Sequence, residues 1–276
     1  MGKGRSYGAP LAEEGARVAF VNDYSRSVLS FTRETGVPDD ITHVHANAVM
    51  CKGFATSSLL FDILADKPGR VESIGIDTFD GEVPESFFGL LEKTTTIWKV
   101  QYMAGWTRDG AKTQRLVECI NRNAGITNFA IGKIAMEHLL VMPNITHLFV
   151  RRKHSNECER WFALFPNLVS FEVDEDDEIE YGWRPSAADY RAIDGMPTIE
   201  IIAGIVLTSA ASCEAFCAWV KHACVSELRR VDVRFEDGPE IDAYVAMCVE
   251  CAASNPGIRN LEINDVEYIS HPFLLK

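Results

Sequence analysis

Two pairs of cysteines have a spacing that could bind a metal ion. Cys213 and Cys217 are about one helical turn apart, as are Cys248 and Cys251, and His222 follows the first pair. Four soft ligands of this kind can close a tetrahedral zinc site. Both pairs, however, lie in segments with the apolar periodicity of half-buried helices, where reduced cysteines pack as small apolar side chains. We therefore predict that these thiols are structural and that no metal site forms.

A run of acidic residues, Asp174 to Glu178, offers oxygen atoms of the kind that bind calcium. The run lacks the glycine-punctuated ligand spacing of a calcium loop, which makes a solvated loop the simpler interpretation. It directly follows a predicted strand, where loops of repeat proteins often meet partners. We therefore interpret Asp174, Asp176 and Asp177 as candidate contacts for Lys or Arg side chains of another protein.

Two short motifs could direct covalent modification. Gly2 and Ser6 fit the N-myristoylation pattern, but the charged Lys3 beside the acceptor glycine favours a solvated terminus. Myristoylation at Gly2 stays an open alternative, and a single lipid chain would give only marginal membrane binding. Asn144 and Thr146 form a glycosylation sequon, which we discount because the N-terminus lacks the continuous apolar core of a signal peptide.

The composition is that of an acidic globular chain. Its 276 residues are 47% hydrophobic and 24% charged, which suffices for a large core. The formal net charge of −13 disfavours nucleic acid as a partner, because phosphates require a clustered basic surface. No apolar run approaches the roughly 18 residues of a membrane helix. We expect an intracellular protein of the cytoplasm, with the nucleus or an organelle left open.

The sequence carries none of the common catalytic motifs. There is no glycine-rich dinucleotide or phosphate loop, no nucleophile elbow and no zinc-protease helix motif. We therefore predict a protein that is not an enzyme and that uses no cofactor.

An internal repeat predicts the elements that position these residues. Met142 to Val150 reads Met-Pro-Asn-Ile-Thr-His-Leu-Phe-Val, and related segments recur at Phe165 to Val173 and Asn255 to Ile263. Each places apolar residues at the first, fourth and sixth positions of a predicted strand, and helical periodicity fills the intervals. The copies are Ile41/Val44/Ala46, Val71/Ile74/Ile76, Ile97/Val100/Tyr102, Ile126/Phe129/Ile131, Ile145/Leu148/Val150, Leu168/Phe171/Val173, Ile199/Ile202/Gly204, Leu228/Val231/Val233 and Ile258/Leu261/Ile263. They begin 19 to 31 residues apart, and a period in the twenties is typical of a strand-plus-helix solenoid.

With its Pro-Asn-Ile and Pro-Asn-Leu strand beginnings, the repeat resembles the leucine-rich repeat, closest to the long type of ribonuclease-inhibitor-like and F-box-associated proteins. The resemblance covers residues 41–264 and implies an α/β leucine-rich-repeat solenoid, a horseshoe arc with a parallel inner sheet and outer helices. Residues 1–40 would form an N-terminal tail and cap, and residues 265–276 a C-terminal tail. The asparagine or cysteine that usually follows the third apolar position is absent, with Gly105, Ile134 and Lys153 among its replacements. We therefore expect an irregular arc.

The side chains between the apolar positions would face the concave surface of the arc, the usual binding face of a solenoid. The candidate partner-binding residues are Trp98, Met103, His147, Phe149, Arg151, Glu172, Asp174, Asp176, Asp177, Arg229, Arg230, Asp232 and Arg234. Aromatic and arginine side chains are common anchors of interfaces. We predict a non-catalytic protein-binding module or scaffold, with a protein partner that carries a basic patch. A structural subunit of a large assembly and a regulator of another enzyme remain alternatives, whereas no F-box-like segment precedes the repeats.

Overall fold

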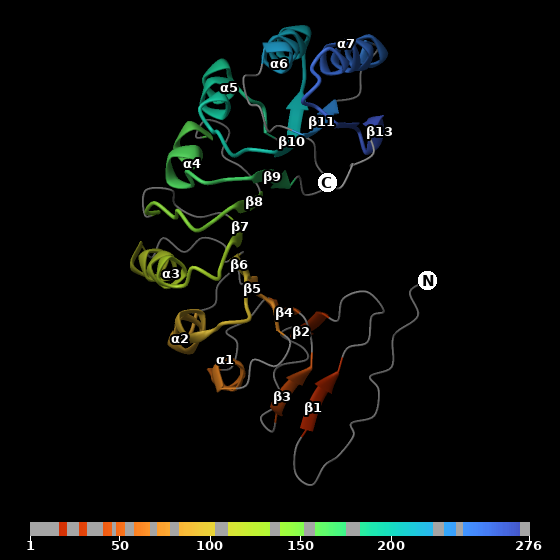
Figure 1. Ribbon diagram of the computed structural model, residues 1–276. Helices are drawn as coiled ribbons and strands as arrows, with labels where there is room; N and C mark the ends of the chain where they lie inside the picture. Colours follow the sequence, from red (N-terminus) through yellow and green to blue (C-terminus); the bar gives the residue numbers. More distant parts are fainter. Residues whose placement is uncertain are drawn as a thin grey trace. The chain divides into compact units, whose positions relative to one another are not determined.

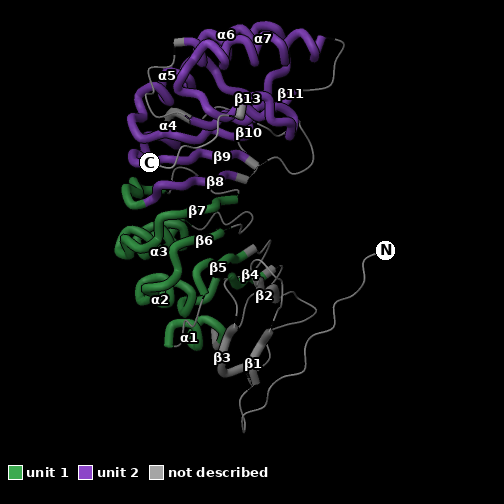
Figure 2. Tube along the Cα trace, turned by 45° about the vertical axis from the view of Figure 1, so that its right-hand side comes forward, with its two compact units in different colours: residues 1–144 green, residues 145–276 purple. Residues whose placement is uncertain are grey.

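The computed structural model divides the chain into two compact units, residues 1–144 and 145–276 (Figure 2). It describes residues 17–20, 28–31, 41–45, 48–52, 58–66, 71–77, 83–102, 110–132, 139–151, 158–174, 183–222, 229–235 and 240–270. The boundary falls between Asn144 and Ile145, inside the best-formed copy of the repeat. Each unit has its own strands and helices.

In unit 1, four strands come first along the chain, and helices and strands then alternate. They are β1 (Arg17–Phe20), β2 (Val28–Phe31), β3 (Ile41–His45), β4 (Ala48–Lys52), α1 (Ser58–Asp66), β5 (Ser73–Asp77), α2 (Glu85–Lys93), β6 (Lys99–Tyr102), α3 (Gly110–Arg122) and β7 (Asn128–Ile131). The strands β2, β4, β5, β6 and β7 pair in this order, all in parallel. The helices α1, α2 and α3 pack in sequence along one side of these strands (Figure 1). Unit 1 is therefore an α/β unit with helices on one face of a parallel sheet.

The predicted position of the first repeat is wrong. Ile41 and Val44 lie in β3, which pairs with β1 in a separate two-stranded sheet. The strand beside β5 is β4, where the buried Val49 stands opposite Ile74. The sequence pattern missed β4 because Met50 lies between Val49 and a buried cysteine, so that no apolar and polar alternation is visible. The predicted tail and cap, residues 1–40, contribute β1 and also β2, which extends the sheet of unit 1.

In unit 2, strands and helices alternate from the first strand, and two consecutive strands end the series. They are β8 (His147–Arg151), α4 (Cys158–Leu164), β9 (Ser170–Asp174), α5 (Ala187–Asp194), β10 (Ile201–Leu207), α6 (Ala210–His222), β11 (Arg230–Phe235), α7 (Ile241–Ala253), β12 (Asn260–Ile263) and β13 (Val266–Ser270). Strands β8 to β12 pair in parallel, and β13 pairs antiparallel with β12. None of the helices that the structure describes in either unit has the length and apolar character needed to cross a membrane.

The strand β13 lies in the segment 265–276 that the sequence predicted as a tail. The chain reverses between β12 and β13 through Asn264 and Asp265, whose φ angles are 48° and 63°. Two successive residues with positive φ are the backbone geometry of the tight turns that favour asparagine and aspartate. This hairpin turns the last strand antiparallel, a change of direction that the repeat pattern does not contain.

The predicted side of each strand is confirmed in the described residues. The fourth and sixth positions are buried in β6 (Val100, Tyr102), β8 (Leu148, Val150), β9 (Phe171, Val173), β11 (Val231, Val233) and β12 (Leu261, Ile263). The first positions, Val71, Ile97, Ile126, Ile145, Leu168, Ile199 and Ile258, are buried as well. Because strand side chains alternate, the intervening residues point to the opposite side of the sheet. The one poor copy, at Gly204, deviates for a reason that the structure supplies.

Gly204 lies at a β-bulge in β10. Its φ angle is +80°, and a Cβ atom there would stand 2.1 Å from the carbonyl oxygen of Val173. The pairing register of β10 with β11 shifts between Ile202 and Ile205. Ile205, which is fully buried, therefore takes the apolar place that the sequence assigned to Gly204. Only glycine combines this backbone conformation with so close a backbone neighbour.

Successive strands are joined by a recurring backbone contact, which we call the shared-carbonyl joint. One carbonyl at the second position of a repeat accepts hydrogen bonds from two consecutive N–H groups of the next repeat. In unit 1 the carbonyl of Trp98 accepts from Thr127 and Asn128, each at 3.1 Å. The other accepting carbonyls belong to Glu72 in unit 1 and to Thr146, Val169, Glu200 and Arg229 in unit 2. The repeat in the sequence thus corresponds to a repeat in backbone hydrogen bonding.

Side-chain amides make further joints, at the turns that lead from a helix to a strand. Asn144 Nδ2 donates to the carbonyl groups of Ile120, Asn123 and Ile126 at 2.9, 3.2 and 3.0 Å. Asn123 Nδ2 donates to the carbonyl groups at Leu91 and at the end of α2, both at 2.8 Å. The repeat lacks the asparagine that usually follows the third apolar position of a strand. Asn123 and Asn144, which precede strands, bind backbone carbonyl groups of neighbouring turns instead. Glycosylation of Asn144 would remove these bonds.

Candidate functional site

The side of the unit 2 sheet that faces away from its helices carries six of the thirteen predicted partner-binding residues. We call it the strand face of unit 2, and its described side chains are His147, Phe149, Glu172, Arg230, Asp232, Arg234, Asn260 and Glu262. His147 and Arg230 are exposed, and the others are half-buried. They alternate along each strand with the buried apolar residues, as the sequence predicted.

On β8 and β9 the strand face combines aromatic and acidic groups. Phe149 stands directly opposite Glu172 in the parallel register. Glu172 Oε1 accepts a hydrogen bond from the buried Ser170 hydroxyl at 2.8 Å. His147 Nδ1 lies 2.9 Å from the hydroxyl of Thr146. These contacts hold the polar side chains of this region in defined positions beside an apolar ring.

On β11 and β12 two carboxylates face each other. Asp232 stands directly opposite Glu262 in the register, an arrangement of like charges that destabilises a strand pair. Arg230 Nη2 approaches Glu262 Oε2 at 3.0 Å, and Arg234 Nη2 approaches Asp265 Oδ1 at 3.4 Å. Among the described residues, the ion pairs of both arginines of the strand are with carboxylates other than Asp232.

Asp232 is left with an incomplete set of hydrogen bonds. Its Oδ1 atom is buried and has no hydrogen-bond partner among the described residues. Burial raises the pKa of Asp232, and the charge of Glu262 raises it further, while Arg234 and Arg230 offset only part of the effect. An additional donor with a positive charge would therefore stabilise this carboxylate. Glu262 was missed by the sequence analysis, although it occupies the place in the last repeat that Asp232 occupies in the preceding one.

The remaining predicted residues lie elsewhere. Arg229 Nη1 is 3.7 Å from Glu200 Oε2, at the second position of neighbouring repeats of unit 2. Trp98 belongs to unit 1, is 40% exposed, and its Nε1 donates to Glu72 Oε2 at 3.4 Å. Met103, Asp176 and Asp177 lie outside the described residues, as do the side chains of Arg151 and Asp174, so the acidic loop and its calcium alternative have no structural account.

The cysteines of α6 and α7 are close together, as their predicted positions on neighbouring helices implied. Cys217 Sγ lies 3.9 Å from Cys248 Sγ. Cys213, Cys217 and Cys248 are buried, and Cys251 is half-buried. In the part of the chain that the structure describes, no three His, Cys, Asp or Glu side chains are grouped so that they could hold a metal ion. The zinc alternative therefore has no support in the described residues.

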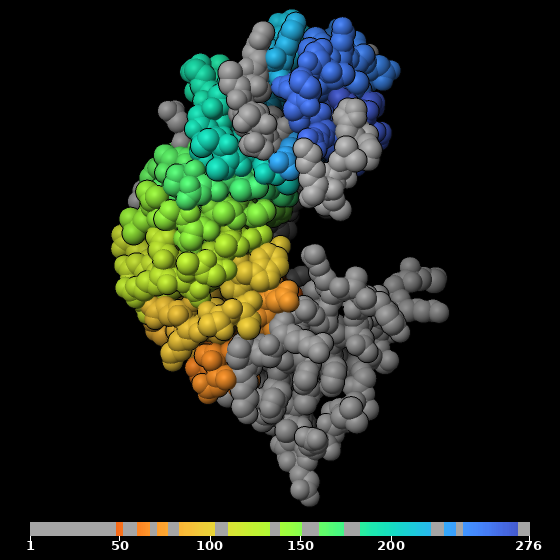
Figure 3. Space-filling model, viewed as in Figure 1, coloured from red at the N-terminus to blue at the C-terminus, as the bar shows by residue number. Residues whose placement is uncertain are grey.

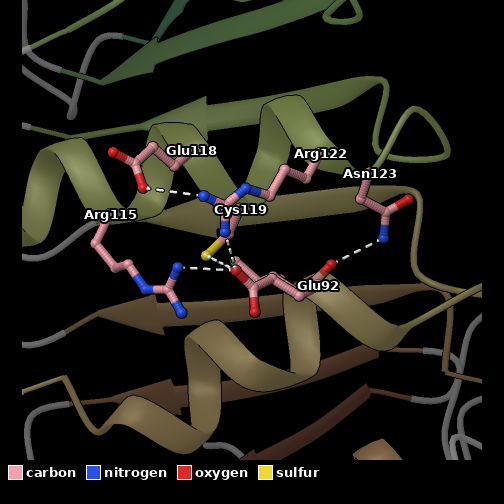
Figure 4. Close-up of polar contacts among 7 residues, drawn as sticks. Glu92, Arg115, Glu118, Cys119, Arg122 and Asn123 are labelled. Atoms are coloured by element: carbon pink, nitrogen blue, oxygen red, sulfur yellow. Dashed lines mark hydrogen bonds and ion pairs between the residues drawn. The ribbon is translucent and has the colours of Figure 1, made fainter.

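An ion network between α2 and α3 of unit 1 is a second polar cluster, which the sequence analysis did not identify (Figure 4). Glu92 Oε1 accepts hydrogen bonds from Arg115 and Arg122, both at 2.8 Å, and Arg122 also pairs with Glu118 at 3.5 Å. Partial burial of Glu92 opposes ionisation, but the hydrogen bonds and charge of Arg115 and Arg122 outweigh it and lower the pKa of Glu92. The charges of this cluster compensate one another, which indicates a joint between helices rather than a binding site.

The chain matches no model of a known protein family, and a search of curated proteins finds no similar sequence. Its function must therefore be inferred from its own residues.

Proposed function

We propose that the chain is a degenerate leucine-rich-repeat-like solenoid and that the strand face of unit 2 binds protein rather than catalysing a reaction. The architecture is supported by the repetition within each unit: parallel strands, apolar fourth and sixth positions, and shared-carbonyl joints. Helices cover one face of each sheet, which leaves the other face for polar and aromatic side chains. Such faces are the usual binding surfaces of solenoid proteins.

The observation that carries the proposal is the carboxylate pair Asp232 and Glu262. Two like charges in direct register are unfavourable in the free protein, and Oδ1 of Asp232 has no donor among the residues described. A Lys or Arg side chain of a partner would supply both a positive charge and hydrogen-bond donors. The partner is therefore a protein with a basic patch, and the net charge of −13 would speed its approach.

The proposal is tested by using the tagged full chain to capture partners from its native cells at low and high salt. Asp232→Asn and Glu262→Gln remove the charges of the pair without changing its shape. The matched control is Glu250→Gln, which removes the same charge from the exposed surface of α7. We expect the wild type and the control to retain a common partner that high salt releases. Each strand-face substitution should weaken its affinity by about tenfold, the order of effect for a charged contact in an interface.

Two results would contradict this assignment. One is a partner whose affinity is the same for Asp232→Asn, Glu262→Gln and the control. The other is binding that high salt does not weaken. A single stoichiometric complex that withstands both substitutions would instead favour the structural-subunit alternative.

A further inference from the structure

The contact between α6 and α7 brings together thiols that the proposed binding function does not use. These helices pack side by side in unit 2 (Figure 3). Cys217 of α6 and Cys248 of α7 are 31 residues apart in the chain, and their sulfur atoms are 3.9 Å apart. Cys251, about one turn further along α7, contributes to the shifted pKa of Cys217. Cys217 and Cys248 therefore form a pair of thiols across the contact of the two helices.

The thiols of this contact differ in the direction of their pKa shifts. The contact with Cys248 lowers the pKa of Cys217, against the opposing effect of burial and with a further contribution from Cys251. The same contact and burial raise the pKa of Cys248. Of the two sulfur atoms, that of Cys217 is therefore the easier one to ionise, and a thiolate beside a protonated thiol is the pairing that disulfide formation requires. Cys213, one turn before Cys217 on α6, differs because burial raises the pKa of its thiol to about 11.

Because the sulfur atoms of Cys217 and Cys248 are buried, only a small oxidant can reach them. Cys217 is 6% exposed and Cys248 is fully buried, whereas Cys251 is half-buried at the edge of the same contact. A peroxide is of a size that fits such restricted access, and a protein or a bulky disulfide is not.

We propose that Cys217 and Cys248 form a peroxide-responsive disulfide site that links α6 to α7. The Cys217 thiolate attacks one oxygen of hydrogen peroxide, the O–O bond breaks, and Cys217 becomes a sulfenic acid while hydroxide leaves and takes up a proton as water. The Cys248 sulfur then attacks the Cys217 sulfur, the S–O bond breaks, and the departing hydroxide combines with the Cys248 proton as a second water. Two thiols are oxidised and one peroxide is reduced. Side-chain rotation brings the sulfur atoms from 3.9 Å to the roughly 2 Å of a disulfide bond.

The test exposes the reduced full chain to hydrogen peroxide, blocks the remaining thiols by alkylation, and maps cross-linked peptides by mass spectrometry without reduction. We expect a Cys217–Cys248 cross-link that a thiol reductant reverses, and that forms faster as the pH rises, because the thiolate is the reactive form. Cys217→Ser should abolish it. Cys51→Ser, the matched control, removes a buried thiol of unit 1 and should leave its rate unchanged.

A comparison within the wild-type chain makes the test independent of whether Cys217→Ser folds. Competitive oxidation should modify Cys217 at least about tenfold faster than Cys213, because the thiolate is the reactive form. The proposal is overturned if Cys217 and Cys213 react at the same rate. It is also overturned if the folded chain yields no cross-link between α6 and α7, or if Cys217 joins Cys251 in place of Cys248.

Discussion

Glu92 in unit 1 and Asp232 in unit 2 are half-buried carboxylates beside two arginines, yet their pKa values are shifted in opposite directions. Both arginines near Glu92 point to its Oε1 atom and donate hydrogen bonds at 2.8 Å. The arginines beside Asp232 are paired instead with Glu262 and Asp265. As a result the pKa of Glu92 is lowered and that of Asp232 is raised.

The difference shows that a nearby charge compensates a carboxylate fully only when its donors are directed at it. The helix joint of unit 1 satisfies its charges internally, as a structural contact should. On the strand face of unit 2, the described ion pairs of the arginines are with Glu262 and Asp265. Oδ1 of Asp232 therefore lacks a hydrogen-bond donor among the described residues. The two regions contain similar residues, and only the direction of the hydrogen bonds separates a joint from a candidate binding site.

We expect the largest change in the free energy of unfolding at Gly204, the glycine that shapes the sheet of the strand face. Gly204→Ala places a Cβ atom 2.1 Å from the Val173 carbonyl oxygen at a φ of +80°. We expect a loss of about 3 kcal/mol or more in the free energy of unfolding by urea, from strain and displacement of β10. In unit 1, Gly75→Ala is the matched control, since its Cβ meets only the flexible end of Met50 at 2.5 Å and Gln101 Cβ at 3.2 Å. Equal losses at both glycines would show that the bulge does not hold the sheet.

The next effect concerns the amide that fixes the end of α3, the helix that carries Arg115 and Arg122. Asn144→Ala removes three hydrogen bonds to buried or half-buried carbonyls. We expect a loss of about 2–3 kcal/mol, because carbonyls left without donors retain their desolvation penalty. Asn255→Ala in unit 2 removes one such bond, to the carbonyl of Val220 at 2.7 Å, and one accepted from the Gly257 N–H at 3.0 Å. It should lose about 1–2 kcal/mol, less than Asn144→Ala. Urea denaturation of both variants measures the ratio, and a larger loss for Asn255→Ala would contradict the interpretation.

A smaller effect tests whether the helix joint depends on charge. Glu92→Gln should lower the free energy of unfolding by about 1 kcal/mol at low salt and by less at high salt. Because the folded-state pKa of Glu92 is lowered, its stabilisation is present above the ordinary pKa of a glutamate and is lost as the pH falls through the folded-state value. Urea denaturation at several pH values should therefore give the wild type and the variant the same free energy of unfolding in acid. A difference that persists there would point to a packing defect.

The smallest expected change in the free energy of unfolding is a gain in stability, at Asp232. The raised pKa of Asp232 means that its ionised form destabilises the fold above its folded-state pKa, an effect that disappears below the ordinary pKa of an aspartate. Asp232→Asn should therefore raise the free energy of unfolding at neutral pH by up to about 1 kcal/mol, within the penalty of one unsatisfied polar atom, and lose this advantage in acid. If the variant is less stable at neutral pH, the carboxylate is compensated in the folded protein and the argument for a basic partner fails.

Sequence periodicity was sufficient for the side chains that face the helices. Val100, Leu148 and Leu261 are buried where the repeat predicted, because the alternation of a strand follows directly from its backbone geometry. The pattern failed where alternation was hidden or interrupted. Met50 masked β4, and Gly204 interrupted β10 at a bulge that only its contact with Val173 explains.

The sequence by itself determined the α/β repeat and the polar character of the strand face, since both depend on spacing along one chain. Tertiary structure decided which polar groups are satisfied. Whether Arg230 reaches Asp232 or Glu262, and whether Asn144 reaches three carbonyls or none, depends on the register between neighbouring repeats. Hydrogen bonds weaken steeply with distance and with departure from a straight angle. Residue type and spacing alone therefore cannot distinguish a carboxylate that has its hydrogen-bond donors from one that lacks them.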